Sequence, residues 1–169
     1  GDTVLVASGT YDENINFLGK AIIVTSEYGP YHTVIDGGQA GSVVKFVSGE
    51  KASSILDGFE ITNGTGTEDT LVRGIAGGGI YCKNTRPKLT NLLIVQNQAD
   101  KGGGLFSSNV PSGQSIEMEN VFLENNTALV AGGGLFLQES HASMTGCKIN
   151  DNQAVAADAW IGGAPAGVL

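Results

Sequence analysis

Gly77-Gly78-Gly79-Ile80-Tyr81 recurs in this sequence as Gly102-Gly103-Gly104-Leu105-Phe106 and again as Gly132-Gly133-Gly134-Leu135-Phe136. The triplets begin at positions 77, 102 and 132, so their spacings are 25 and 30 residues. No Gly-Lys-Ser/Thr follows any of them and no helix pattern begins there, which excludes a phosphate-binding loop. Such triplets indicate corners where the backbone needs a positive φ or a close approach. Their recurrence is typical of a repeat protein.

A second repeated unit lies between the triplets. It occurs at residues 89–99 (LTNLLIVQNQA), 118–128 (MENVFLENNTA) and 144–154 (MTGCKINDNQA), with a degenerate copy at 56–63 (LDGFEITN). Because successive side chains of a strand point to opposite faces, the alignment predicts columns of inward side chains. These columns are Leu89, Met118 and Met144; Leu92, Val121 and Cys147; and Ile94, Leu123 and Ile149. The same alternation places Leu93, Phe122 and Lys148 outside.

Short β units of this length bury their apolar face only by stacking on their neighbours. We therefore expect an all-β fold, a single-stranded right-handed parallel β-helix (solenoid) of about six to seven coils. The composition agrees, because 169 residues contain 26 glycines but 4 prolines, and no stretch sustains a helical apolar rhythm. A chain of this length is expected to form one domain.

Within that single domain (1–169), residues 1–63 are expected to form less regular coils and residues 77–154 the regular glycine-triplet coils. Residues 64–76 interrupt the repeat and are expected to form a loop that projects from one corner, where function usually resides in solenoids. Residues 155–169 are apolar and glycine-rich. They are expected to be either a cap plugged by Trp160 or the cut edge of a longer solenoid, which would self-associate through its ends. The start at Gly1 without a methionine or signal peptide suggests a processed product or an excised piece.

The asparagines of one repeat position and the two cysteines are both expected to have structural roles. Asn97, Asn126 and Asn152 fall at one turn, where stacked side chains are expected to form an asparagine ladder. Cys82 and Cys147 lie in different columns about two coils apart, roughly 10 Å, so we expect two unpaired thiols.

The charge balance limits the classes of partner that the chain is expected to bind. With 9 basic and 17 acidic residues the net charge is −8, which disfavours nucleic acid and, unless calcium bridges them, anionic membranes and polyanionic sugars. No apolar run approaches 18 residues, so the chain is not expected to span a membrane.

The opening Gly1-Asp2-Thr3-Val4-Leu5-Val6-Ala7-Ser8-Gly9-Thr10-Tyr11, together with Thr33-Val34-Ile35-Asp36-Gly37 and residues 56–61, resembles pectin-lyase-like β-helix proteins. The Gly-Gly-Gly-Ile/Leu elements and Phe122-Leu123-Glu124-Asn125 are similar to repeats of chlamydial polymorphic outer-membrane proteins and related bacterial surface β-helices. The resemblance covers nearly the whole chain and implies a secreted or cell-surface location, often in contact with polysaccharide. It implies no particular activity, since lyases, esterases, epimerases and adhesins share this scaffold. The aspartate trio, His-Gly and Arg-Ile-Lys elements of polygalacturonases and the Asp-Pro-His-Asp motif of alginate epimerases are absent.

Two sets of residues are candidate binding sites. If Ile80, Leu105 and Leu135 point inward, then Tyr81, Phe106 and Phe136 point outward and stack roughly 5 Å apart, with Trp160 continuing the column. Exposed, this aromatic stripe would bind sugar rings; the alternative is that corner loops cover the rings, which then only pack on each other.

Carboxylates form the second set. Glu117, Glu119 and Glu124 crowd one coil, and Asp36, Asp57 and Glu60 crowd an earlier stretch. The first trio is the candidate for binding calcium, the one cofactor that the sequence suggests. The alternative is that these side chains form a solvated outer face that keeps the protein soluble.

These patterns support two functional hypotheses. The first is a non-catalytic module of a secreted or cell-surface protein that binds polysaccharide or surface glycans, or is structural or adhesive. The second is a polysaccharide-active enzyme of the lyase or hydrolase type. The first is preferred because the repeat shows no convergent catalytic set, and no catalytic residue is assigned.

Overall fold

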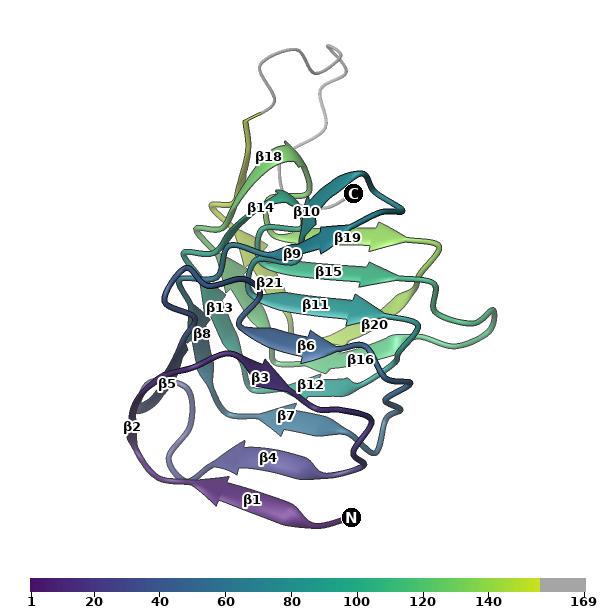
Figure 1. Ribbon diagram of the computed structural model, residues 1–169. Coiled ribbons are helices and arrows are strands. Elements are labelled where there is room, and N and C mark those ends of the chain that lie inside the picture. The colour runs from purple at the N-terminus through teal and green to yellow at the C-terminus, as the bar shows by residue number, and fades with distance from the viewer. Residues whose placement is uncertain (156–169) are drawn as a thin grey trace.

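The computed structural model describes residues 1–155, which form 22 strands and no helix (Figure 1). Every strand pair is parallel except one hairpin, so the fold is the parallel β-solenoid that the repeat predicts. The solenoid has about five turns instead of six to seven. The coils differ in length, because 20 residues separate Thr3 from its register partner Ile23, whereas 32 separate Ile23 from Ile55 in the next coil.

The strands stack into four sheets, with one strand from each coil except in sheet D, where β9 and β10 come from the same coil. Sheet A consists of β1 (Thr3–Val6), β4 (Ile23–Ser26), β7 (Ile55–Asp57), β12 (Lys88–Thr90), β16 (Ile116–Glu119) and β20 (Ala142–Thr145). Sheet B consists of β2 (Gly9–Asp12), β5 (Thr33–Asp36), β8 (Glu60–Thr62), β13 (Leu93–Val95), β17 (Phe122–Glu124) and β21 (Lys148–Asn150). Sheet C consists of β3 (Ile15–Asn16), β6 (Val44–Phe46), β11 (Ile80–Lys83), β15 (Leu105–Ser108) and β19 (Leu135–Gln138). Sheet D consists of β9 (Thr67–Asp69), β10 (Gly74–Ala76), β14 (Gln98–Lys101), β18 (Thr127–Ala131) and β22 (Gln153–Ala154).

The predicted columns are confirmed by the strand register. Leu89 pairs with Met118 and Met118 with Met144 in sheet A. The corresponding column in sheet B is Ile94, Leu123 and Ile149. Met144 keeps its register but is exposed, because among the described residues β20 has a neighbour on one side only.

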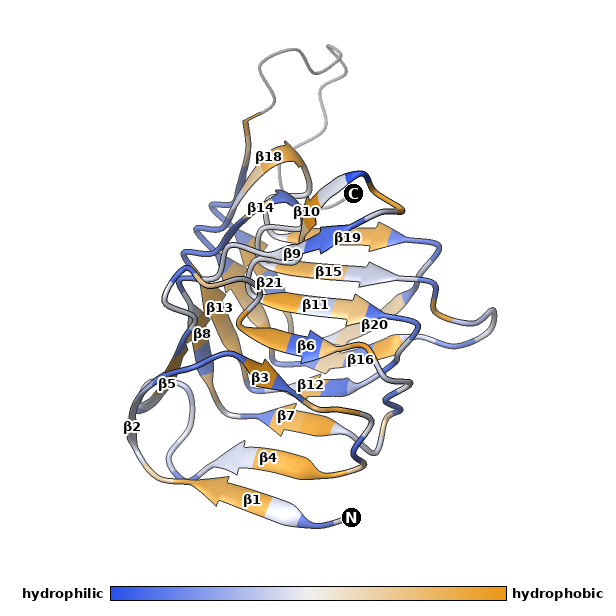
Figure 2. Cartoon of the chain, viewed as in Figure 1, coloured by the Kyte–Doolittle hydropathy of each residue, from blue (hydrophilic) through white to orange (hydrophobic). Residues whose placement is uncertain are grey.

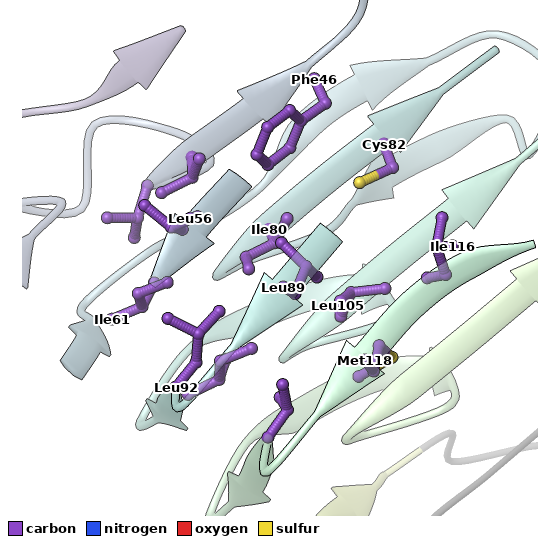
Figure 3. Close-up of a cluster of buried hydrophobic side chains, with 14 of the residues drawn as sticks. Phe46, Leu56, Ile61, Ile80, Cys82, Leu89, Leu92, Leu105, Ile116 and Met118 are labelled. Carbon is purple, nitrogen blue, oxygen red and sulfur yellow. The ribbon is translucent and has the colours of Figure 1, made fainter. Parts of the chain in front are cut away.

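The inward side chains of sheets A, B and C meet in one continuous apolar core (Figure 3). The third column contributes to it through buried Leu92 and Val121 and half-buried Cys147. Cys82, which is fully buried in the same core, and Cys147 are both free thiols, as expected. Figure 2 shows the apolar residues concentrated along the strands of successive coils. Within residues 1–155 no helix qualifies as a membrane span.

Each glycine of a triplet has its own reason to be glycine, as the second triplet shows. Gly102 has a φ of +63°, which L side chains rarely adopt. A Cβ on Gly103 would lie 2.3 Å from the carbonyl oxygen of Thr127, so the chain of the next coil leaves no room for a side chain there. A Cβ on Gly104 would lie 2.9 Å from Nδ2 of Asn126. The corner therefore needs both the positive φ and the close approach that the sequence suggests as alternatives.

The asparagine ladder is also confirmed. Nδ2 of Asn97 donates to Oδ1 of Asn126 at 3.0 Å, and Nδ2 of Asn126 donates to Oδ1 of Asn152 at 3.0 Å. The same oxygens accept from the backbone N–H groups of Asn97 and Asn126. All three side chains are buried, so the ladder satisfies backbone groups that have no access to water.

Residues 64–76, predicted as a projecting loop, form a more ordered element. β9 and β10 pair antiparallel through Thr67–Ala76, Glu68–Ile75 and Asp69–Gly74. β10 then joins the parallel sheet through the single pair Ala76–Lys101. We call residues 67–76 the hairpin; its turn contains residues 70–73 and lies beside sheet C.

Candidate functional site

The predicted aromatic column exists. Tyr81 and Phe106 stack with ring centroids 5.5 Å apart, and Phe106 and Phe136 stack at 5.9 Å, with an angle of 8° between the planes in each pair. The three rings lie outside the main core, because Ile80, Leu105 and Leu135 fill the inward positions beside them.

The rings do not form an exposed stripe, however. Tyr81 is 3% exposed and Phe106 is fully buried, because Val72 and Ala76 of the hairpin pack against them in a second apolar cluster. Phe136 is half-buried. The predicted open platform is therefore wrong for Tyr81 and Phe106, and the alternative of a covering corner element describes them correctly. Trp160 lies outside the described residues, as do residues 156–169 of the predicted cap.

Hydrogen bonds to Asp69 hold the hairpin against the stacked aromatic rings. Its buried carboxylate accepts hydrogen bonds from the hydroxyl of Tyr81 and from Nζ of Lys83, the latter at 3.1 Å. It also accepts from the backbone N–H groups of Leu71 and Val72, which close the hairpin turn. Burial alone would raise the pKa of Asp69, but these four hydrogen bonds outweigh it and lower the pKa below its usual value.

Replacing Asp69 with asparagine is expected to lower the free energy of unfolding by about 2 kcal/mol near pH 7, because the Lys83 ammonium loses its carboxylate partner. A carboxyl whose folded pKa is lowered stabilises the fold above its unfolded pKa, and this stability is lost as pH falls below about 4 through the folded pKa. The difference between wild type and Asp69→Asn in urea unfolding should therefore shrink towards pH 3. The control is Glu68→Gln on the neighbouring exposed position. A difference of equal size at both pH values would contradict this account.

The proposed calcium trio is not brought together. Glu117 and Glu119 are exposed on β16 of sheet A, whereas Glu124 belongs to β17 of sheet B. Glu119 is instead paired with Lys88, with Oε2 and Nζ 3.2 Å apart. Within residues 1–155, no three His, Cys, Asp or Glu side chains gather in a way that could hold a metal ion.

The earlier carboxylates are also separated by the sheets. Asp57 on sheet A accepts hydrogen bonds from Thr25, Thr90 and Asn91, which link three coils along the outer face. Asp36 on sheet B accepts from Nδ2 of Asn63 and from the N–H of Gly38. Glu60 differs from both, since its carboxylate has no hydrogen bond or ion pair to any described residue.

A surface groove with an exposed aromatic ring lies at the edge between sheets A and B. Its volume is about 230 Å³, and it is lined by Pro30, Tyr31, Asn91, Leu92, Leu93, Asn120 and Phe122. Tyr31 is 74% exposed. The lining combines an exposed phenol ring, a half-buried phenyl ring and two amide side chains, and we call it the Tyr31 groove.

The Tyr31 groove is shaped by three parts of the chain. Pro30 and Tyr31 come from the loop between β4 and β5, whereas Leu93 and Phe122 are the first residues of β13 and β17. Leu93 and Phe122 are register partners, and Lys148 is the next residue of the same column along sheet B. Nζ of Lys148 lies 5.0 Å from the centroid of the Phe122 ring. The repeat predicts the outward position of Leu93, Phe122 and Lys148 correctly. It gives no signal for Tyr31, because the loop of residues 27–32 has no counterpart in the repeat.

Comparisons with protein-family profiles, with curated proteins and with solved structures return no significant match for this chain.

Proposed function

We propose that this chain is a non-catalytic β-solenoid module of a secreted or cell-surface protein, and that it binds a glycan in the Tyr31 groove. The observation that supports this proposal is the exposed ring of Tyr31 in one groove with Phe122, Asn91 and Asn120. The resemblance of the repeats to pectin-lyase-like and polymorphic outer-membrane β-helices favours the same class of partner and location.

The chemistry of the groove suits a sugar. A pyranose ring presents a C–H face that stacks on an aromatic ring and a rim of hydroxyl groups that need hydrogen-bonding partners. Asn91 and Asn120 each carry an amide oxygen that accepts and an NH₂ group that donates. One side-chain bond already joins them, from Nδ2 of Asn120 to Oδ1 of Asn91 at 3.2 Å, which leaves Oδ1 of Asn120 without a described donor.

Replacing Tyr31 with alanine is expected to weaken glycan binding about tenfold, because the exposed ring provides one face of the groove. The fold should be unaffected, since the ring is largely in water. Binding would be measured by isothermal titration with soluble cello-, manno- and chito-oligosaccharides.

Tyr28→Ala is the matched control for this experiment. Tyr28 belongs to the same loop and is 63% exposed, but it does not line the groove. Equal affinity of wild type and Tyr31→Ala for every oligosaccharide that binds, or binding to none, would overturn the proposal.

A second candidate function, a polysaccharide-active enzyme, is favoured by one observation. Burial raises the pKa of Glu60, which lies in sheet B beside Leu93 of the groove. A carboxyl with a raised pKa next to a sugar is suited to donate a proton to a leaving oxygen. Release of reducing ends or unsaturated products from the bound polymer, abolished in Glu60→Gln, would support the enzyme; intact polymer after prolonged incubation would contradict it.

A further inference from the structure

Glu60 lies on the strand next to Leu93 of the Tyr31 groove, although it is not one of the residues that line the groove. It begins β8, which lies between β5 and β13 in sheet B, and it is the register partner of Leu93. Its other register partner is Val34 of β5, three residues after Tyr31. Glu60 therefore lies between the loop that carries Tyr31 and the Leu93 side of the groove.

Glu60 is an acid of sheet B whose carboxylate has no hydrogen bond or ion pair to any residue from 1 to 155. It is half-buried, and burial is the cause that raises its pKa. The neighbouring acids Asp36 and Asp57 have hydrogen-bond donors, but no donor or cation among the described residues reaches Glu60. A partly desolvated carboxylate without a partner is unfavourable, and a ligand cation that reaches it relieves this cost.

We propose that the glycan bound in the Tyr31 groove is an amino-sugar polymer, and that Glu60 pairs with a protonated amine of the sugar while Tyr31 and Phe122 hold its ring. This inference rests on the proposed glycan-binding function and specifies its ligand. Charge complementarity supports it, since the chain as a whole carries a net charge of −8.

The lysine of the same surface does not cancel this preference. Lys148 is on β21, three strand spacings from β8, and its Nζ lies over the ring of Phe122 on β17, which is two strand spacings, roughly 10 Å, from β8. At physiological ionic strength the Debye length is about 8 Å, so the ammonium of Lys148 is largely screened from an amine at Glu60.

The test compares two ligands with the same backbone: chitosan oligosaccharides, which carry free amines, and their N-acetylated chitin counterparts of matched length. At about pH 6 the wild type is expected to bind the free amine form about fivefold more tightly. Glu60→Gln should remove this preference and leave the affinity for the acetylated form unchanged. Because a negatively charged protein attracts any polycation, Glu117→Gln is the control; it makes the same change in net charge at an exposed site on sheet A.

Each outcome separates this inference from the proposed function. Binding of both ligands that depends on Tyr31 but shows no preference for the amine would overturn the role of Glu60 and leave glycan binding intact. An equal loss of preference in Glu60→Gln and Glu117→Gln would overturn it as well, since general attraction would then explain the result. If neither ligand binds the wild type, both the inference and a chitin-type ligand for the groove are refuted; cello- or manno-oligosaccharide binding decides whether the proposed function survives.

Discussion

Replacing Gly103 with alanine is expected to lower the free energy of unfolding by more than about 4 kcal/mol. The added Cβ would lie 2.3 Å from the carbonyl oxygen of Thr127, 2.6 Å from that of Gly133 and 2.7 Å from the carbonyl carbon of Thr127. All three atoms belong to the backbone of the next coil, so no side-chain rotation relieves the clash. Two coils would have to move apart at this corner. Urea unfolding followed by circular dichroism measures the effect.

Gly113→Ala serves as the control for this prediction. Gly113 has a φ of +76° but has no atom within 4 Å of the position of its Cβ. Its substitution should therefore cost only the backbone strain of a left-handed residue, about 1–2 kcal/mol. If the two variants lost similar amounts of unfolding free energy, the close approach of the coils would not be the reason that position 103 needs a glycine.

The second large effect is expected for Asn126→Ala, at about 3–4 kcal/mol of unfolding free energy. Asn126 is the middle rung of the ladder, and its side chain bonds to Asn97, to Asn152 and to the backbone carbonyl of Ile94. Its removal leaves the buried N–H of Asn97 and the carbonyl of Ile94 without these partners. Each buried group left unsatisfied costs about 1–3 kcal/mol.

Asn150→Ala is the matched control, because Asn150 is an exposed asparagine of β21 whose side chain has no described hydrogen bond. Its effect should stay within about 0.5 kcal/mol. Thermal unfolding of both variants at one pH measures the contrast. A loss for Asn126→Ala as small as that for Asn150→Ala would mean that water replaces the ladder at this turn.

The repeat predicts much of the fold because a solenoid makes distant contacts periodic. Met118 meets Leu89 simply because both occupy the same place in the repeat, and the same reasoning places Asn126 against Asn97. The number of coils is predicted less well, since the irregular early coils show no triplet that would reveal their length.

The surface could be predicted only where it follows the repeat. The stacking of Tyr81 on Phe106 follows from the register, but their burial does not. It depends on Val72 and Asp69 of the hairpin, which form a single insertion with antiparallel pairing and no second copy for comparison. The Tyr31 groove is similar, because its loop reaches Leu93 and Phe122 on later coils through contacts that no period encodes.

The spacing of the ladder has a consequence for how this chain can change in length. Asn97 and Asn126 are 29 residues apart and Asn126 and Asn152 are 26 apart, yet both pairs make the same 3.0 Å bond. The connection from β15 to β16 is longer than that from β19 to β20, and it includes exposed residues from Pro111 to Gln114. Since closing a somewhat longer loop costs little free energy, insertions and deletions are tolerated at this connection. At the glycine corner even one extra methyl group meets the backbone of the following coil, so evolution can lengthen the molecule on one side of its circumference and not on the other.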